Sequence, residues 1–205
     1  MSYQWLEWAK KIQALSQAGL TFSKDMYDIE RYEELRNISA EIMSHNTELD
    51  MTKIKDLFTN ETGYQTPKVD VRGVVFKNNQ ILMVKENIDN KWALPGGFCD
   101  IGLSPSENVV KEIKEESGYD VMPVRLLALL DKNKHQHPPE PYHYYKIFIL
   151  CEIIGGEATI GIETNNVHFF SQHNLPPLST NRNTMAQIDI LFEFLRTPEK
   201  KTLFD

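Results

Sequence analysis

The chain has 205 residues, of which 41% are hydrophobic and 25% are charged, a composition typical of a globular protein with one substantial domain and a smaller one. Its net charge of −7 disfavours a nucleic-acid-binding surface spread over the whole molecule, although a local basic groove stays open as an alternative. The sequence has no apolar run of the roughly 18 residues that a membrane span needs, so we expect no membrane partner.

The cysteine content and the N-terminus indicate the cellular setting. Two cysteines, Cys99 and Cys151, are too few for a disulfide framework and form no CxxC metal pair. The first residues, MSYQWLEWAKK, lack the basic, apolar and small-residue order of a secretion signal. We therefore expect a reduced, cytoplasmic setting.

Residues 1–66 are predicted to be helical. In residues 2–20, Trp5, Trp8, Ile12 and Leu15 follow a three-four spacing, and Gly19 is placed as a C-cap glycine would be. A second helix is expected to begin near Ser23 or Asp25, and a short third segment covers 51–58. One face of the second helix carries Ile29, Tyr32, Leu35, Ile38 and Ile42.

This helical segment needs a partner, because Trp5 and Trp8 present more apolar area than a unit of two or three helices can bury alone. We expect it to pack on the main domain or on a second subunit, so a dimerisation role competes with that of a simple helical cap. A helix-turn-helix DNA reader is disfavoured by charge. The segment holds seven Lys or Arg and eleven Asp or Glu, which leaves a net charge of −4 that would repel phosphate.

The pattern changes after a predicted linker at 63–68, where Pro67 disfavours a preceding helix. Strands are predicted at 69–76 and 80–86 around an Asn78-Asn79 hairpin turn, at 121–131, 146–154 and 167–170, with Gly155-Gly156 as a further turn. A final amphipathic helix carries Ile188, Leu191, Phe192 and Leu195. Because strands and helices mix without βαβ alternation, an α+β fold or an α/β sandwich is favoured over a doubly wound sheet. We expect two domains, 1–66 and 67–205.

A helix at 105–117 follows the interruption Trp92-Ala-Leu-Pro-Gly-Gly-Phe98. Ser104 is the predicted N-cap with Glu107 completing a capping box, and Gly118 is the predicted C-terminal stop. The helix places Glu112, Glu115 and Glu116 within an arc of roughly 100°. Such like charges destabilise a helix by a few tenths of a kcal/mol. A solvated face is one interpretation, and a site for a divalent cation, which prefers clustered carboxylate oxygens, is the other.

Residues Gly97 to Tyr119 resemble the signature of the Nudix hydrolases, G-x5-E-x7-R-E-U-x-E-E-x-G-U, in which U is a bulky apolar residue. Counted from Gly97, the second half of the signature falls on Lys111, Glu112, Ile113, Glu115, Glu116 and Gly118. Two positions depart, because Leu103 and Lys111 stand where the family has Glu and Arg. We expect Leu103, Lys111 and Gly118 to support the site, and Lys111 to pair with Glu115 one turn away.

The resemblance implies the α/β/α sandwich of that family, with a mixed sheet, and hydrolysis of the pyrophosphate bond in a nucleoside diphosphate linked to another moiety. It implies Mg²⁺ or Mn²⁺ as cofactor. The implied metal ligands are Glu112, Glu115, Glu116 and the carbonyl of Gly97. Glu116 and Glu163 are the two candidates for the general base, although Glu163 also suits a plain turn.

Substrate contacts are expected outside the signature. Arg72 is a candidate for phosphate contact because a charge in an otherwise apolar strand needs a partner. Residues 131–146 are rich in Lys, His, Pro and Tyr, and Phe98, Tyr144 and Tyr145 are candidates for stacking a base or enclosing a quaternary ammonium, the tyrosines also suiting plain strand positions. Zinc binding by the histidines of that stretch is disfavoured because no fourth ligand has a suitable spacing. These histidines are His135, His137 and His143.

Stretches outside the signature, such as YEELRNISAEIM, GYQTPKVDVRGVVF and LPPLS, are similar to a Nudix branch with an N-terminal helical domain. Its members are often labelled ADP-ribose pyrophosphatases, and within it the chain looks closest to the CDP-choline pyrophosphatases, which give CMP and phosphocholine. This resemblance implies a homodimer. The alternatives are an ADP-ribose pyrophosphatase, an enzyme acting on RNA ends, and a catalytically weak nucleotide-binding regulator. Only Lys132, Lys134 and Arg182 hint at RNA.

Overall fold

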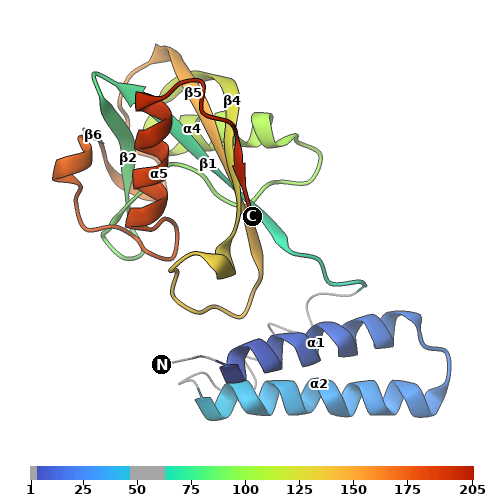
Figure 1. Ribbon diagram of the computed structural model, residues 1–205. Helices are drawn as coiled ribbons and strands as arrows, with labels where there is room; N and C mark the ends of the chain where they lie inside the picture. The colour runs from blue at the N-terminus through green and yellow to red at the C-terminus, as the bar shows by residue number, and fades with distance from the viewer. Residues whose placement is uncertain (1–3, 47–62) are drawn as a thin grey trace. The chain divides into compact units, whose positions relative to one another are not determined.

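The computed structural model describes residues 4–46 and 63–205 (Figure 1). The chain forms two compact units, residues 1–67 with 139–142, and residues 68–138 with 143–205. The first unit contains helices α1 (Gln4–Phe22) and α2 (Met26–Asn46). The third helical segment predicted at 51–58 lies outside the described residues.

The two N-terminal helices meet closely at a glycine. The predicted C-cap at Gly19 is wrong, because α1 continues to Phe22. A Cβ atom on Gly19 would lie 2.4 Å from the ring of Tyr32 on α2, so glycine allows the helices to approach. The predicted start of α2 is confirmed at Asp25, whose side chain accepts hydrogen bonds from the backbone N–H groups of Tyr27 (2.9 Å) and Asp28 (3.2 Å).

The interface between α1 and α2 is small and partly polar. It buries Leu6, Ala9, Ala40 and Met43, and the Ser39 hydroxyl donates to the Ala9 carbonyl at 2.8 Å. Larger apolar side chains stay on the outside of the pair, including part of the face predicted for α2. Those that are at least 39% exposed are Trp8, Leu15, Phe22, Met26, Tyr27, Leu35 and Ile38.

A mixed sheet forms the centre of the second unit. Its strands follow the order β3-β2-β1-β5-β4-β7, with β6 paired to β2. β1 runs parallel to β5 and antiparallel to β2, and β4 runs antiparallel to β5. The strands are β1 (Lys68–Lys77), β2 (Gln80–Glu86), β3 (Trp92–Ala93), β4 (Tyr119–Asp131), β5 (Tyr144–Gly156), β6 (Thr164–Phe170) and β7 (Leu203–Phe204).

Two predicted turns have different outcomes. The hairpin turn at Asn78-Asn79 is confirmed, since both residues have positive φ (52° and 59°) between β1 and β2. The turn predicted at Gly155-Gly156 is wrong, because both glycines continue β5 and pair with Asp120 and Tyr119 of β4.

Helices α4 (Pro105–Ser117) and α5 (Met185–Arg196) lie on opposite faces of the sheet (Figure 1). On the α4 face, Val71 and Val75 of β1 pack in one cluster with Val109 and Ile113. On the other face, Val74 packs in a second cluster that contains the apolar face of α5. This is the predicted α+β sandwich, preceded by the helical pair. Two short 3-10 helices, η1 (Lys132–Lys134) and η2 (Gln172–Asn174), lie in the connections.

Helix α4 begins and ends as predicted. Ser104 and Glu107 form the capping box, and Gly118 ends the helix in the left-handed conformation with φ +78°. The helix also lies very close to β1, since a Cβ atom on Gly73 would be 2.4 Å from Cδ1 of Ile113. The position of α4 over the sheet therefore depends on the absence of a side chain at residue 73.

No helix in the described ranges 4–46 and 63–205 is both long enough and apolar enough to cross a membrane.

Replacing Gly118 by Ala tests the tight end of α4. A Cβ atom there would lie 2.4 Å from the Glu157 carbonyl oxygen, in addition to the strain of a positive φ. Gly102→Ala is the matched control, because Gly102 has φ +93° but open space around it. Urea denaturation should show a loss of about 1–3 kcal/mol from strain in both variants, and a further loss of about 1–3 kcal/mol from overpacking in Gly118→Ala alone. Equal losses would contradict this account.

Candidate functional site

The glycine loop between β3 and α4 lies directly against β1. The backbone N–H groups of Gly73 and Val71 donate to the carbonyls of Pro95 (2.8 Å) and Gly97 (2.9 Å). Gly96 has φ +141°, and a Cβ atom there would lie 2.0 Å from the Val71 carbonyl oxygen. Only glycine permits this approach, so the sequence Pro-Gly-Gly places the loop backbone where α4 can reach it.

Two of the predicted glutamates contact this loop from α4. The Gly96 N–H donates to Oε2 of Glu116 at 2.8 Å. The carboxylate of Glu112 lies beside Gly97, where a Cβ atom would be 3.1 Å from its Oε2. Glu116 is 7% exposed and the Glu112 side chain 15%. The structure thus brings together Gly97, Glu112 and Glu116.

Glu115 has a different environment. Nζ of Lys111 lies 3.1 Å from a carboxylate oxygen of Glu115 and 3.1 Å from one of Asp100, so the pair predicted between Lys111 and Glu115 is confirmed. The Glu115 side chain is 58% exposed. Within the described part of the chain, no three His, Cys, Asp or Glu side chains are arranged to hold a metal ion.

Leu103, at the departing signature position, is 39% exposed in the turn before α4. That turn is held by a residue that sequence reasoning missed. The fully buried Asn108 accepts a hydrogen bond from the Asp100 N–H (2.8 Å) and donates to the Leu103 carbonyl (3.2 Å). An amide on the first turns of α4 therefore holds the loop from within, and the side chain of Leu103 is not needed for this.

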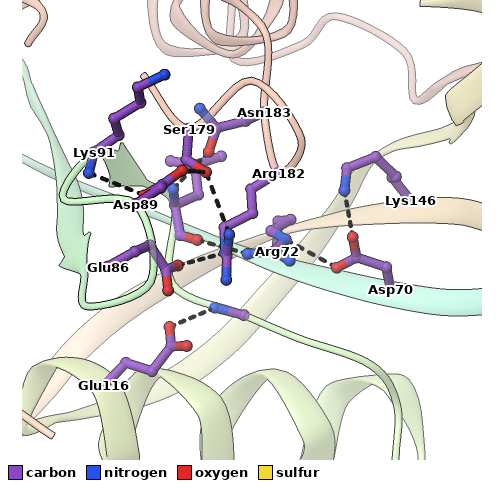
Figure 2. Close-up of polar contacts among 12 residues, drawn as sticks. Asp70, Arg72, Glu86, Asp89, Lys91, Glu116, Lys146, Ser179, Arg182 and Asn183 are labelled. Carbon is purple, nitrogen blue, oxygen red and sulfur yellow. Dashed lines mark hydrogen bonds and ion pairs between the residues drawn. The ribbon is translucent and has the colours of Figure 1, made fainter. Parts of the chain in front are cut away.

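Sequence reasoning also missed a buried glutamate at the end of β2. Glu86 is 2% exposed, and its Oε1 lies 2.7 Å from Nε of Arg182 (Figure 2). Burial raises its pKa, and Arg182 and Arg72 oppose that rise. Glu163 is exposed in the bend before β6, and its charge acts on both Glu86 and Glu112. The predicted candidate Glu163 is thus near the site, together with a carboxylate that was not predicted.

The pKa of Glu116 shows how negative this region is. This pKa is raised to about 8, chiefly by burial and in addition by the charges of Glu86 and Glu112, while Arg72 and the bond from Gly96 act in the opposite direction. A carboxylate with so high a pKa lacks sufficient positive charge around it. An additional cation would stabilise its ionised form.

Arg72 lies on β1 with its guanidinium held by the protein. Its Nε donates to Oδ1 of Asp70 at 2.8 Å, and its Nη1 to the Leu94 carbonyl at 3.1 Å. Lys146 of β5 donates to the other oxygen of Asp70. Burial would raise the pKa of Asp70, but the two cations more than offset this and hold it below its ordinary value. The alternation of charged and apolar residues in β1 and β5 could have revealed Asp70 and Lys146 by the reasoning that singled out Arg72.

The three aromatic candidates divide between two places. The rings of Phe98 and Tyr144 lie 5.2 Å apart, and Nζ of Lys132 is 4.6 Å from the centre of the Tyr144 ring. Tyr145 follows Tyr144 on β5, so it points to the opposite face of the sheet, where it contacts His143. Phe98 and Tyr144 can act together, and Tyr145 cannot join them.

The polar residues of 131–146 do not converge on one point. His135 contacts Asp205 at 3.2 Å, His143 contacts Asp131 at 2.9 Å, and His137 contacts the Thr180 carbonyl at 2.7 Å. The three histidines therefore make separate contacts.

A NUDIX domain family model matches residues 66–193. The chain belongs to the Nudix hydrolase family. A second model, described as a UDP-X-like N-terminal oligomerisation domain, matches residues 3–58. The Bacillus subtilis (strain 168) protein YjhB, described provisionally as an ADP-ribose pyrophosphatase, is 62% identical over 98% of this chain and 97% of its own.

Two solved structures are similar to this Nudix chain. A UDP-X diphosphatase is 33% identical with a TM-score of 0.65, and the match covers 99% of this chain and 98% of that one. An ADP-ribose pyrophosphatase from Streptococcus suis is 45% identical with a TM-score of 0.63. That match covers 68% of this chain and 100% of the other.

Replacing Asp70 by Asn should destabilise the fold, because two buried cations would lose the carboxylate between them. The expected loss in free energy of unfolding is about 3–5 kcal/mol. Asp120→Asn is the control, since Asp120 forms an exposed pair with Lys114 at 2.8 Å that is worth less than about 1 kcal/mol. Denaturant unfolding of both variants checks this. Similar small losses in free energy of unfolding for both variants would show that the ion pairs of Asp70 with Arg72 and Lys146 are not needed for stability.

Proposed function

We propose that the protein hydrolyses the pyrophosphate bond of a nucleoside diphosphate linked to another moiety, and that CDP-choline, cleaved to CMP and phosphocholine, is its substrate. The observation that carries the reaction class is the contact of Glu112 and Glu116 with the Gly96-Gly97 loop. This contact sets a buried carboxylate, Glu116, and a partly buried one, Glu112, beside a glycine backbone that a substrate can approach closely.

The residues present fit a divalent cation. The available donors are carboxylate oxygens and the Gly97 carbonyl, which are hard ligands that Mg²⁺ and Mn²⁺ prefer. Mg²⁺ is commonly held by one or two carboxylates together with water and substrate phosphates. We therefore propose Glu112, Glu116 and the Gly97 carbonyl as ligands. Glu115 would join them only by leaving Lys111, from which it is 3.1 Å away.

When bound, the cation would polarise a phosphoryl oxygen and lower the pKa of a bound water. The chain itself supplies the base and the phosphate contacts. Glu116 and Glu163 are the proposed candidates for the base, and Glu163 has the more accessible carboxylate. Arg72 is held by Asp70 and Leu94, so we propose that it mainly fixes the loop and moderates the negative charge of Glu116.

The proposal also names the nucleoside of the substrate. The UDP-X diphosphatase, which matches over almost the whole chain, is named for a pyrimidine nucleotide. This supports a cytidine nucleotide and agrees with the resemblance to CDP-choline pyrophosphatases. The names of YjhB and the Streptococcus suis protein favour ADP-ribose as the second candidate. Phe98 and Tyr144 are the proposed stacking residues for either base.

The other two candidate functions have less support. Lys132 is 2% exposed against Tyr144, and Arg182 is only partly exposed, so these two residues do not form a continuous exposed basic groove for RNA. A regulator without catalysis would not require a carboxylate such as Glu116, whose pKa is raised by burial and, to a smaller extent, by Glu86 and Glu112. Neither alternative accounts for the site as well as hydrolysis does.

We further propose that residues 1–66 form a dimerisation domain and that residues 67–205 form the catalytic domain. The support comes from the exposed apolar residues of α1, where Trp8, Leu15 and Phe22 recur every seven residues and are 58%, 60% and 69% exposed. Surfaces of this kind are typical of protein interfaces. The family description of residues 3–58 as an oligomerisation domain agrees.

A substrate panel tests the reaction. With Mg²⁺ or Mn²⁺ the wild-type protein should release CMP from CDP-choline faster than AMP from ADP-ribose, and should not act on a short 5′-triphosphorylated RNA. Glu116→Gln should lower kcat by roughly 10²–10⁴-fold. Glu152→Gln, an exposed glutamate on β5, should leave kcat unchanged. Faster release of AMP from ADP-ribose would show that ADP-ribose is the preferred substrate instead of CDP-choline. No product from any of the three compounds would refute the hydrolytic function.

Charged substitutions on α1 test the dimer in the full-length protein. Trp8→Glu combined with Leu15→Glu should reduce the mass measured by light scattering from that of a dimer to that of a monomer, because the apolar surface would then carry two charges. Glu33→Lys changes an exposed polar position of α2 and should leave the dimer intact. A dimeric mass for the α1 double variant would exclude this face as the interface.

A further inference from the structure

The loop that carries Arg182 is fixed to β3. The Trp92 N–H donates to the Pro177 carbonyl at 3.0 Å, and the Ser179 N–H donates to the Trp92 carbonyl at 2.8 Å. The fully buried Asn183 accepts from the Leu94 N–H at 2.8 Å. Because Leu94 is next to Pro95 and the glycine loop, the backbone of Arg182 has a defined position relative to the carboxylates.

The guanidinium of Arg182 is held by contacts through two of its three nitrogens. Its Nε lies 2.7 Å from Oε1 of Glu86, and its Nη1 donates to the Ser179 hydroxyl at 3.3 Å. Ser179 in turn donates to Asp89 at 2.7 Å. Neither contact of Arg182 uses Nη2 (Figure 2). Since the group is planar and rigid, contacts through two of its nitrogens fix the direction of the remaining N–H donors.

Exposure distinguishes this arginine from Arg72. The Arg182 side chain is 26% exposed while its partner Glu86 is 2% exposed, so it extends from the surface to a buried carboxylate. Arg72 is 5% exposed, and its Nε and Nη1 are used by Asp70 and Leu94. A ligand that enters from solvent can therefore reach the guanidinium of Arg182 more readily than that of Arg72.

Stability does not explain the pair between Glu86 and Arg182. Buried ion pairs are on average no more stabilising than apolar residues of similar volume. Glu86 also adds negative charge to a site that has an excess of it, and this disfavours the ionised form of Glu116. Such a carboxylate is useful if it orients a cation that is needed at this place. Arginine recognises phosphate through two parallel N–H groups, so its orientation matters.

We propose that Arg182 binds an oxygen of the substrate diphosphate through the N–H donors of Nη2, which neither Glu86 nor Ser179 uses. Glu86 and Ser179 are the positioning residues that hold it in this orientation. The inference rests on the proposed function for its substrate class, a nucleoside diphosphate. It assigns to Arg182 the phosphate contact that the sequence suggested for Arg72.

Binding of nucleoside diphosphates to the full-length protein tests this without catalysis. Isothermal titration calorimetry in Mg²⁺ would measure the Kd of CDP and of ADP, with cytidine as the probe that lacks phosphate. Arg182→Ala should raise the Kd of both diphosphates at least tenfold and leave that of cytidine unchanged. Arg182→Lys should give an intermediate loss. Arg196→Ala, an arginine at the end of α5, is the matched control and should bind like the wild type.

Glu86→Gln tests the positioning role. Removing a negative charge would by itself strengthen the binding of an anion, so weaker binding of CDP shows that Glu86 orients Arg182. We expect Glu86→Gln to raise the Kd of CDP about threefold to fivefold. When Glu86→Gln is added to Arg182→Ala, we expect no further rise. Unchanged or tighter binding by Glu86→Gln in the wild-type background would overturn the positioning role.

The results separate this inference from the proposed function. The proposed contact would be overturned if the Kd of CDP and ADP for Arg182→Ala lay within twofold of the wild-type value. It would also be overturned if the Kd of cytidine rose by the same factor as that of the diphosphates. Either result would hold even if CDP-choline is hydrolysed. No measurable binding of either diphosphate to the wild type would overturn it as well. Conversely, weakened binding in Arg182→Ala together with no hydrolysis of any substrate would support the contact and refute the pyrophosphatase.

Discussion

The hydrogen bonds between β1 and residues 95–97 determine where every other group of the site lies. They hold a Pro-Gly-Gly backbone against the sheet at a distance that only glycine allows at residue 96. Helix α4 then brings Glu112 and Glu116 to the outer side of this backbone, and Arg72 and Asn183 bind the two polar groups of Leu94 from the other side. The active site is therefore organised around a short piece of main chain.

The electrostatics of the site follow from this arrangement. Glu86, Glu112 and Glu116 are drawn together around a loop that offers few compensating charges, and the cations that do approach are supplied by β1 and by the loop before α5. The protein thus tolerates a local excess of negative charge, which a divalent cation of the kind that Nudix hydrolases generally use would offset.

Features that depend on neighbours in the sequence could be predicted from it. The capping box of α4, the Asn78-Asn79 turn and the pair between Lys111 and Glu115 all belong to this class. Features that depend on tertiary approach could not. Gly19 and Gly155-Gly156 look like local stop signals, yet they serve helix packing and strand pairing. Glu86 and Arg182 are about a hundred positions apart, so no spacing rule connects them.

Gly73, the β1 glycine that packs against α4, affects how the carboxylates of that helix are placed. At Gly73, the space between β1 and Ile113 is too small for a side chain. Glu112 and Glu116 lie on the same helix as Ile113. Residue 73 therefore sets the height of α4 above the sheet. A larger residue there would force Ile113 to move, and with it the packing of the helix that carries both carboxylates. The placement of the candidate site's carboxylates thus depends on packing beneath the helix, at a position that is not itself among the candidate site residues.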